Sequence, residues 1–505
     1  MKGKVYLVGA GPGDHKLMTI KGLECIRKSD VIVYDRLANS SFLKEAKSDC
    51  EFIYVGKASS NHILPQEDIN KVISEKAIEG KIVTRLKGGD PYVFGRGGEE
   101  AEELVNRGIE FEVVPGITSA IGGLCYAGIP ITHRDHASSF HVITGHHRDD
   151  DTKEINWHAL ANNKGTLVFL MGVSNLKRIS ENLIKEGKDR NTPVAFISWA
   201  TRYNQRVVTS TLENLYKDAI EQNVKPPTLI VVGSVVELRD KLNFFENKKL
   251  FGSNVAVTRS RLQNSTLVEK ISDLGGNPIE IPTIKIEKIE DNFDLEKEIK
   301  DIQKYTYIAF TSKNSVDIFF DKLEEMNSDS RALAGLKVCS IGSATSDSLN
   351  KRGIKADICP KKFVAEYLFE ELKEDLTSED NVLIPRSENA RDYLVENISK
   401  LCPVKEVHIY RTVIDSDKKD EVIDVLNSED LDYITFTSSS TIKNLVEIIG
   451  EDKLSLLKRI KVVSIGPITS KTARDFGIEI YKEADVSTID GIVDVIIEDK
   501  YKVHI

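Results

Sequence analysis

The sequence predicts an α/β protein of two or three domains, with parallel sheets covered by helices. Short β-branched runs alternate with helix-length amphipathic segments almost throughout the 505 residues. Glycine-rich turns follow several of these runs directly, as GAGPGD follows KVYLV. The second half also repeats its own pattern at an interval of about 125 residues, which indicates two similar α/β units.

The composition is that of a globular protein, with 40% hydrophobic and 29% charged residues. A chain of this length is too long for a single core. The net charge of −10 argues against nucleic-acid and membrane-surface partners, because such partners need a basic field. The six cysteines include no C-x-x-C pair and are typical of thiols in a reducing cytosol. Without a signal peptide or a long apolar run, we expect a cytoplasmic protein.

The first glycine-rich turn, residues 9–14, has the outline of a dinucleotide-binding loop. Its third glycine position holds Asp14, a negative charge where a diphosphate would have to lie. Pro12 removes one backbone donor from the same turn. The turn therefore favours a ligand that contains an adenosine but no phosphate.

Three further segments place glycines and small residues directly after predicted strands: 84–100, 113–134 and 192–208. The first contains GGDPYVFGRGGEE, the second VVPGITSAIGG and the third SWATRYNQ. The Pro-Gly turn and small residues of the second segment indicate that the backbone approaches another group closely there. The strand pattern breaks at residues 240–252 and starts again, so we expect the main domain boundary there.

These segments resemble the uroporphyrinogen-III C-methyltransferases of the tetrapyrrole methylase family, from about residue 3 to 240. The resemblance implies a two-lobed methylase fold in residues 1–245, S-adenosyl-L-methionine as the cofactor, and a homodimer formed through this half. It assigns cofactor contacts to Pro12, Gly88, Gly89, Asp90, Val93, Thr118, Ser119, Met171 and Ala200. At Ala200 the family has a glycine, so we expect a slightly crowded contact.

The resemblance assigns a proton acceptor to Asp35 and a proton donor to Lys57. Methylation of an electron-rich pyrrole carbon leaves a cationic ring, so a positioned carboxylate can take the departing proton. Taken alone, Asp35 could be an acid at a helix entry, and Lys57 a solvated surface charge.

The expected substrate carries many carboxylates, so an acidic protein must concentrate cations locally. The candidates are Arg85, Lys87, Arg96, Arg134 and Arg148, of which we expect Arg96 and Arg134 to bind substrate. Five histidines also gather between residues 133 and 147: His133, His136, His141, His146 and His147. They lack regular helical spacing and supporting carboxylates, so we expect no metal, and carboxylate binding or simple loop placement remain the alternatives.

The second half carries the internal repeat in three pairs of segments: VAVTRS and VLIPRS, AFTSKNSV and TFTSSSTI, SIGSAT and SIGPIT. With VHIYRT at 407–412, this layout resembles uroporphyrinogen-III synthase, a bilobed fold with parallel sheets and a two-strand hinge. The resemblance covers the domain at 246–505. One lobe would comprise about 253–283 and 412–505, and the inserted lobe about 287–408.

The resemblance assigns Tyr410 a role in the departure of a hydroxyl, although an aromatic packed on the hinge is an equal alternative. Ser312, Thr345, Ser438 and Thr469 match hydroxyls that line the cleft, where helix N-termini suit carboxylates. Asn314 stands where relatives often have arginine. A carboxylate contact is then either missing or supplied elsewhere, with Arg259, Arg261, Arg386 and Arg391 as the candidate replacement cations.

Together the two resemblances imply a bifunctional enzyme of tetrapyrrole biosynthesis. The second half would cyclise hydroxymethylbilane to uroporphyrinogen III, and the first would methylate it twice to precorrin-2, toward sirohaem or cobalamin. A separate precorrin-2 dehydrogenase or chelatase would follow. Two alternatives remain open: an inactive synthase-like docking module beside an active methyltransferase, and a tetrapyrrole-binding regulator.

Overall fold

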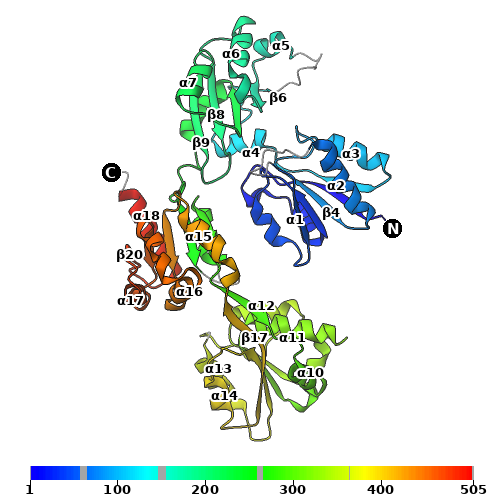
Figure 1. Cartoon of the computed structure of the whole chain (residues 1–505), viewed down its shortest axis with the longest axis vertical. Coiled ribbons are helices and arrows are strands. Elements are labelled where there is room, and N and C mark those ends of the chain that lie inside the picture. The colour runs from blue at the N-terminus through cyan, green and yellow to red at the C-terminus, as the bar shows by residue number, and fades with distance from the viewer. Residues whose placement is uncertain (1, 57–64, 146–154, 259–264, 363, 503–505) are drawn as a thin grey trace. The chain divides into compact units, whose positions relative to one another are not determined.

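The computed structural model describes residues 2–56, 65–145, 155–258, 265–362 and 364–502. Contacts divide the chain into two compact units, the first mainly before Asn254 and the second mainly after it. Each unit contains two five-stranded sheets. The α/β class expected from the sequence is confirmed in both units (Figure 1).

The first sheet is parallel throughout, in the order β3-β2-β4-β1-β5. Its strands are β1 (Lys4–Gly9), β2 (Val31–Tyr34), β3 (Glu51–Tyr54), β4 (Val83–Lys87) and β5 (Glu110–Val114). Helix α1 (Ile20–Lys28) packs on one face, and α2 (Gln66–Ile78) and α3 (Gly97–Asn106) pack on the other. All five strand ends lie at one edge, which is where ligands bind in parallel sheets.

The second sheet is mixed, in the order β6-β7-β10-β8-β9. Its strands are β6 (Phe140–Thr144), β7 (Thr166–Leu170), β8 (Pro193–Ser198), β9 (Arg206–Thr211) and β10 (Thr228–Val232). Its helices are α4 (Ser119–Tyr126), α5 (Trp157–Asn162), α6 (Leu176–Lys185), α7 (Leu215–Glu221) and α8 (Arg239–Leu242). Only β6 and β7 are parallel. The expectation of parallel sheets is wrong here, because the short connection from β8 to β9 cannot hold a crossover helix.

The third sheet has the order β12-β11-β18-β19-β20. Its strands are β11 (Asn254–Thr258), β12 (Asn277–Glu280), β18 (Tyr433–Phe436), β19 (Lys461–Ser464) and β20 (Lys482–Glu483). Its helices are α9 (Ser265–Asp273), α15 (Lys419–Asn427), α16 (Ser439–Ile449), α17 (Pro467–Asp475) and α18 (Ile489–Lys502). The pairs β11–β18, β18–β19 and β19–β20 are parallel, as the repeat pattern predicts.

The fourth sheet has the order β13-β17-β16-β14-β15. Its strands are β13 (Ile284–Lys288), β14 (Tyr307–Phe310), β15 (Lys337–Ser340), β16 (Val382–Ser387) and β17 (Val404–Ile414). Its helices are α10 (Phe293–Lys300), α11 (Lys313–Glu325), α12 (Ser343–Lys351), α13 (Ala365–Asp375) and α14 (Tyr393–Ile398). Only the β13–β17 pair is antiparallel, and it contributes Ile414 to one apolar core and Ile286 to another. β13 and β17 are therefore the two segments of the chain that connect these cores, and they lie side by side.

None of the helices in the described ranges is both long and apolar enough to cross a bilayer.

A buried carboxylate attaches the last helix to the third sheet. Asp499, on α18, is only 4% exposed and accepts hydrogen bonds from Tyr433 Oη at 2.8 Å and Lys461 Nζ at 2.6 Å. Tyr481 Oη donates to its other oxygen. Burial raises the pKa of the Asp499 carboxyl, but the accepted hydrogen bonds outweigh burial and hold the pKa below its ordinary value.

We expect Asp499→Asn to lower the free energy of unfolding at neutral pH by about 3 kcal/mol, because it leaves buried donors without their anion. Since the folded pKa is depressed, this contribution is complete above the ordinary pKa and is lost as the pH falls through the folded one. Urea unfolding of both proteins at several pH values measures it. Asp494→Asn, at an exposed position on the same helix, is the control. An equal effect of both substitutions would contradict the prediction.

Candidate active sites

Backbone of three loops meets at the carboxyl edge of the first sheet. Gly11 and Gly89 exchange hydrogen bonds, with N···O distances of 3.2 and 2.7 Å. Both have positive φ, at 75° and 70°, which favours glycine. A Cβ on Gly9 would lie 2.5 Å from the Gly116 nitrogen, so the loops after β1 and β5 also touch without side chains between them. Close backbone approach, predicted from the sequence, is confirmed as contact between loops.

Asp90 joins two of these loops through its carboxylate. Oδ2 accepts from the Gly116 N–H at 3.0 Å, and Oδ1 accepts from the Tyr92 N–H at 2.8 Å. The carboxylate therefore fixes the loop after β4 against the loop after β5. Gly88 and Val93 lie in the same segment, before and after Asp90.

Helix α4 begins beside these loops. Thr118 is its N-cap and accepts from the Ala120 N–H at 3.4 Å, and Ser119 is its first residue. A Cβ on Gly122, one turn later, would lie 2.9 Å from Cγ of Pro12. The first loop is therefore packed directly on the helix that the Pro-Gly turn precedes.

Strained backbone gathers in the same loops and in those that follow β7 and β8. Among the described residues, every positive φ outside glycine, asparagine and aspartate occurs there: Phe94, Arg96, Met171, Trp199 and Thr201, with φ between 49° and 68°. Such conformations cost about 1–3 kcal/mol each and cluster at functional sites. Met171 is also 53% exposed, which is unusual for a methionine of a globular protein.

The loop after β8 contacts the first loop directly. The Asp14 N–H donates to Thr201 Oγ1 at 2.9 Å, and Tyr126 Oη donates to Asp14 Oδ2 at 2.8 Å. Burial, with the hydrogen bond to Asp14, raises the pKa of Tyr126. Neither Tyr126 nor Thr201 was recognised from the sequence, because neither belongs to a glycine-rich turn.

Ala200 is buried, and its methyl group belongs to an apolar cluster. A Cβ on Gly123 of α4 would lie 2.9 Å from that of Ala200. The methyl group is thus accommodated because position 123 has no side chain.

Asp35 follows β2 and is held at both carboxylate oxygens. Oδ1 accepts from the Leu37 N–H at 3.0 Å, and Oδ2 accepts from Arg85 Nη2 at 3.1 Å. The Asp35 side chain is 24% exposed. No helix begins at this point, so the alternative of a helix-entry acid is wrong. Lys57, the predicted proton donor, lies outside the described residues.

Arg85 and Lys87 are not available to substrate carboxylates, contrary to the sequence prediction. Both are buried and pair with Glu100 of α3, with N···O distances of 3.3 and 2.6 Å. They alternate along β4 on the face that α2 and α3 cover, which hydropathy alone could not reveal. Arg96 forms an exposed pair with Glu99, and Arg134 lies exposed in a turn. Arg148 lies outside the described residues.

The histidine cluster is only partly described. The rings of His133 and His136 are 5.1 Å apart, and His141 Nε2 lies 2.7 Å from Asn163 Nδ2. Within the described ranges, no group of three or more His, Cys, Asp or Glu side chains could hold a metal ion. His146 and His147 lie outside those ranges.

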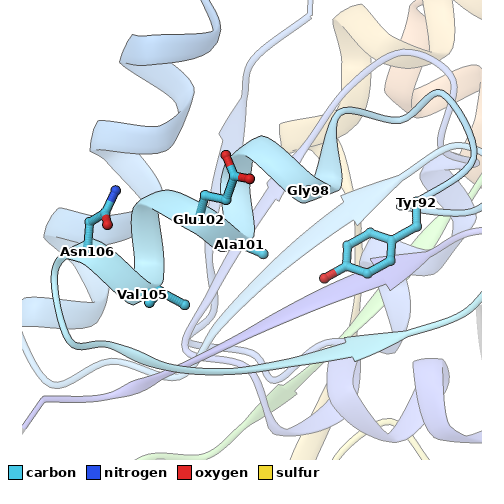
Figure 2. Close-up of a pocket in the computed structure, with 6 residues that line it drawn as sticks. All are labelled: Tyr92, Gly98, Ala101, Glu102, Val105 and Asn106. Carbon is cyan, nitrogen blue, oxygen red and sulfur yellow. The ribbon is translucent and has the colours of Figure 1, made fainter.

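A shallow groove of about 390 Å³ lies along α3 (Figure 2). It is lined by Tyr92, Gly98, Ala101, Glu102, Val105 and Asn106. None of these is a predicted site residue, and Glu102 and Asn106 point outward from the helix in the close-up. The groove is therefore separate from the contacts between the glycine loops.

In the second unit, two predicted site residues 98 positions apart are hydrogen-bonded. Tyr410 Oη lies 2.9 Å from Ser312 Oγ. Ser312 is also the N-cap of α11, in a capping box with Ser315. Tyr410 is only 6% exposed and contributes to the apolar core of the fourth sheet. The packing matches the alternative of an aromatic packed on the hinge, and the predicted role of Tyr410 in the departure of a hydroxyl stays a prediction.

The repeat extends to individual hydrogen bonds. Ser340 Oγ lies 2.6 Å from Ser346 Oγ, and Ser464 Oγ lies 2.5 Å from Ser470 Oγ at the matching place in the other sheet. Thr345 and Thr469 are the third residues of α12 and α17, and both are buried. Ser438 is the N-cap of α16, with Oγ 2.9 Å from that of Ser440.

The two candidate replacement cations that the structure describes, Arg386 and Arg391, are already paired. Arg386 is 2% exposed and lies 3.0 Å from Asp392 and 3.1 Å from Glu406. Arg391 pairs with Glu366 at 3.2 Å. Arg259 and Arg261 lie outside the described residues.

Two family models match this chain. The model for tetrapyrrole (corrin/porphyrin) methylases matches residues 4–216, and the model for uroporphyrinogen-III synthase HemD matches residues 265–494. Both matches confirm the resemblances drawn from the sequence.

Individual relatives agree. The porphyrin biosynthesis protein HemD of Ruminiclostridium josui is 41% identical over 98% of each chain. A uroporphyrinogen-III C-methyltransferase of Priestia megaterium is 53% identical over 46% of this chain and 98% of its own. The structure of uroporphyrin-III C-methyl transferase from Thermus thermophilus with S-adenyl homocysteine is 37% identical, with a TM-score of 0.41, over 47% of this chain and 94% of that one. The chain is therefore an enzyme of porphyrin biosynthesis that belongs to the tetrapyrrole methylases over its first half and to the uroporphyrinogen-III synthases over its second.

Proposed function

We propose that the second half cyclises hydroxymethylbilane to uroporphyrinogen III and that the first half methylates this product twice to give precorrin-2. The observation that carries the proposal is the convergence of glycine loops and strained backbone at one sheet edge in the methylase half. The product of one half is then the substrate of the other, so the fusion makes chemical sense.

The same loops fit S-adenosyl-L-methionine as the methyl donor. The residues that would hold it are Pro12, Gly88, Gly89, Asp90, Val93, Thr118, Ser119, Met171 and Ala200. A Cβ on Gly89 would meet no atom nearer than 3.8 Å, so the bare backbone there leaves room for a flat adenosine, whereas the carboxylates of Asp14 and Asp90 disfavour a nucleotide phosphate. When bound, the sulfonium supplies a methyl group to a nucleophilic ring carbon.

Asp35 accepts the proton that leaves the pyrrole ring after each methyl transfer. Its pairing with Arg85 holds the carboxylate in one orientation, which a proton acceptor requires. Lys57 supplies a proton or steadies a substrate carboxylate, and Arg96 and Arg134 bind further carboxylates at the rim.

In the synthase half, Tyr410 and Ser312 act as a pair. Tyr410 Oη donates a hydrogen bond to the hydroxyl that leaves hydroxymethylbilane, and Ser312 Oγ, 2.9 Å away, orients the phenol. Thr345, Ser438 and Thr469 lie at helix beginnings, where hydroxyls and backbone N–H groups suit substrate carboxylates. The protein chiefly holds the flexible chain in the geometry of ring closure.

The remaining proposals concern the surroundings of the reaction. The protein acts in the cytoplasm as a homodimer formed through the methyltransferase half. Precorrin-2 passes to a separate dehydrogenase or chelatase toward sirohaem or cobalamin.

Incubation of the full chain with hydroxymethylbilane and labelled S-adenosyl-L-methionine tests both activities. We expect the uroporphyrinogen III isomer without the methyl donor, and two labelled methyl groups per macrocycle with it. Chromatography and mass spectrometry of the oxidised products measure both. Formation of the I isomer alone would favour an inactive synthase module, and an unlabelled macrocycle would contradict methyl transfer.

Gly116→Ala tests the place of the methyl donor. The new Cβ would overlap the Gly89 carbonyl oxygen, so the loops must separate. We expect calorimetric affinity for S-adenosyl-L-methionine to fall at least tenfold, about 1.4 kcal/mol. In the same chain, cyclisation should stay unchanged. Gly98→Ala is the matched control, because a Cβ there meets no atom within 4 Å. Unaltered affinity in Gly116→Ala would place the donor elsewhere.

Tyr410→Phe tests the synthase pair. It removes the phenol while keeping the packed ring, so we expect stability to change little and the cyclisation rate to fall about tenfold to hundredfold. The rate of methylation of supplied uroporphyrinogen III serves as the internal control. A cyclisation rate equal to that of the unchanged protein would leave Tyr410 as a packing residue only.

A further inference from the structure

A buried chain of charges lies under the proposed proton acceptor. Asp35 pairs with Arg85, Arg85 pairs with Glu100, and Glu100 pairs with Lys87, at 3.1, 3.3 and 2.6 Å. The side chains of Arg85, Lys87 and Glu100 are each at most 5% exposed. Two cations and two anions thus balance in a region from which water is largely excluded.

Glu100 is the point where this chain is held together. Its Oε1 accepts from Arg85 Nε, from Lys87 Nζ and from Gln66 Nε2, the last at 3.1 Å. Its Oε2 is buried without a hydrogen-bond partner. One carboxylate on α3 therefore fixes both cations of β4, and it does so at the cost of an unsatisfied oxygen.

Arg85 transmits this anchoring to Asp35. Its planar guanidinium also donates from Nη1 to the backbone oxygens of Leu86 at 3.0 Å and Val33 at 3.4 Å. Nε donates to Glu100 and Nη2 donates to Asp35, so all three nitrogens of the guanidinium group have partners that fix its plane. A lysine could not replace this fixed fork.

We propose that Glu100 is a positioning residue for methyl transfer, which fixes the orientation of the Asp35 carboxylate by holding Arg85. The inference rests on the proposed role of Asp35 as proton acceptor. The proposal adds Glu100 of α3 and Arg85 of β4 to the residues that serve methyl transfer, although neither touches substrate or cofactor.

The described charged groups that face this region come from several elements. Arg85 and Lys87 lie on β4 and Glu100 on α3, while Arg202 donates from Nη2 to the Leu37 carbonyl oxygen at 3.1 Å. Burial lowers the pKa of Lys87, and Arg85 lowers it further, against the opposing effect of Glu100.

Substitution of either positioning residue should lower the rate of methyl transfer. Glu100→Gln removes the anion that holds the Arg85 guanidinium, and Arg85→Met removes the fork that holds the Asp35 carboxylate. We expect kcat to fall about tenfold to hundredfold in both, with a smaller change in KM, because the acceptor is misplaced while the binding groups are untouched.

Glu102→Gln, at an exposed position on the same helix, is the matched control, and urea unfolding followed by circular dichroism reports whether the methylase half of each variant is folded. If Arg85→Met fails to fold, Glu100→Gln carries the test. Loss of methyl transfer in Asp35→Asn, together with a lowered kcat and a smaller change in KM in Glu100→Gln, supports the proposal. Loss in Asp35→Asn with an unchanged kcat in Glu100→Gln overturns the positioning role alone. Full activity of Asp35→Asn overturns the proton-acceptor role, and the positioning role with it.

Discussion

Contact between bare backbone segments is the constraint on which the methylase half depends. Gly9, Gly89 and Gly116 follow three different strands, and they can meet only because those strands are parallel and neighbouring. Any side chain at Gly9 or Gly116 would push the loops apart, so their separation is set by backbone geometry rather than by rotamers. The strained residues Met171 and Trp199 extend the same design into the loops of the second sheet, where the fold must compensate for their conformation.

The synthase half obtains equivalent rigidity by duplication. In each repeat, a serine at the end of a strand contacts a serine in the first turn of the next helix, across an extended glycine at the helix N-cap: Ser340 with Ser346 in α12, and Ser464 with Ser470 in α17. The repeated sequence segments therefore encode the local geometry at the helix beginnings. Ser312 shows that such a residue can cap its helix and also form a hydrogen bond with Tyr410.

Sequence patterns predicted those features of this protein that depend on residues close together in the chain. Strand runs and the turns after them follow from such patterns, whereas the contact of Ser312 with Tyr410 was not predicted. The second sheet departs from the expected parallel order, because hydropathy does not encode strand direction. Arg85 was a candidate for binding substrate carboxylates, yet its direction depends on which face of β4 the helices cover. Partners supplied by distant helices, such as Tyr126 for Asp14, left no local signal.

The charged side chains buried beneath the edge of the first sheet contribute both to the stability of the fold and to the geometry of the proposed proton acceptor. Removing any one member of the set around Glu100 leaves an uncompensated charge where water cannot replace it, which typically costs about 3–5 kcal/mol. Loss of one member therefore destabilises the other members of the set. The geometry of the set depends on the packing of α3 on β4. Asp35 lies at the only end of this set that keeps appreciable exposure among the four side chains. A carboxylate held in this way meets solvent and substrate on one side, while the fold defines its orientation on the other.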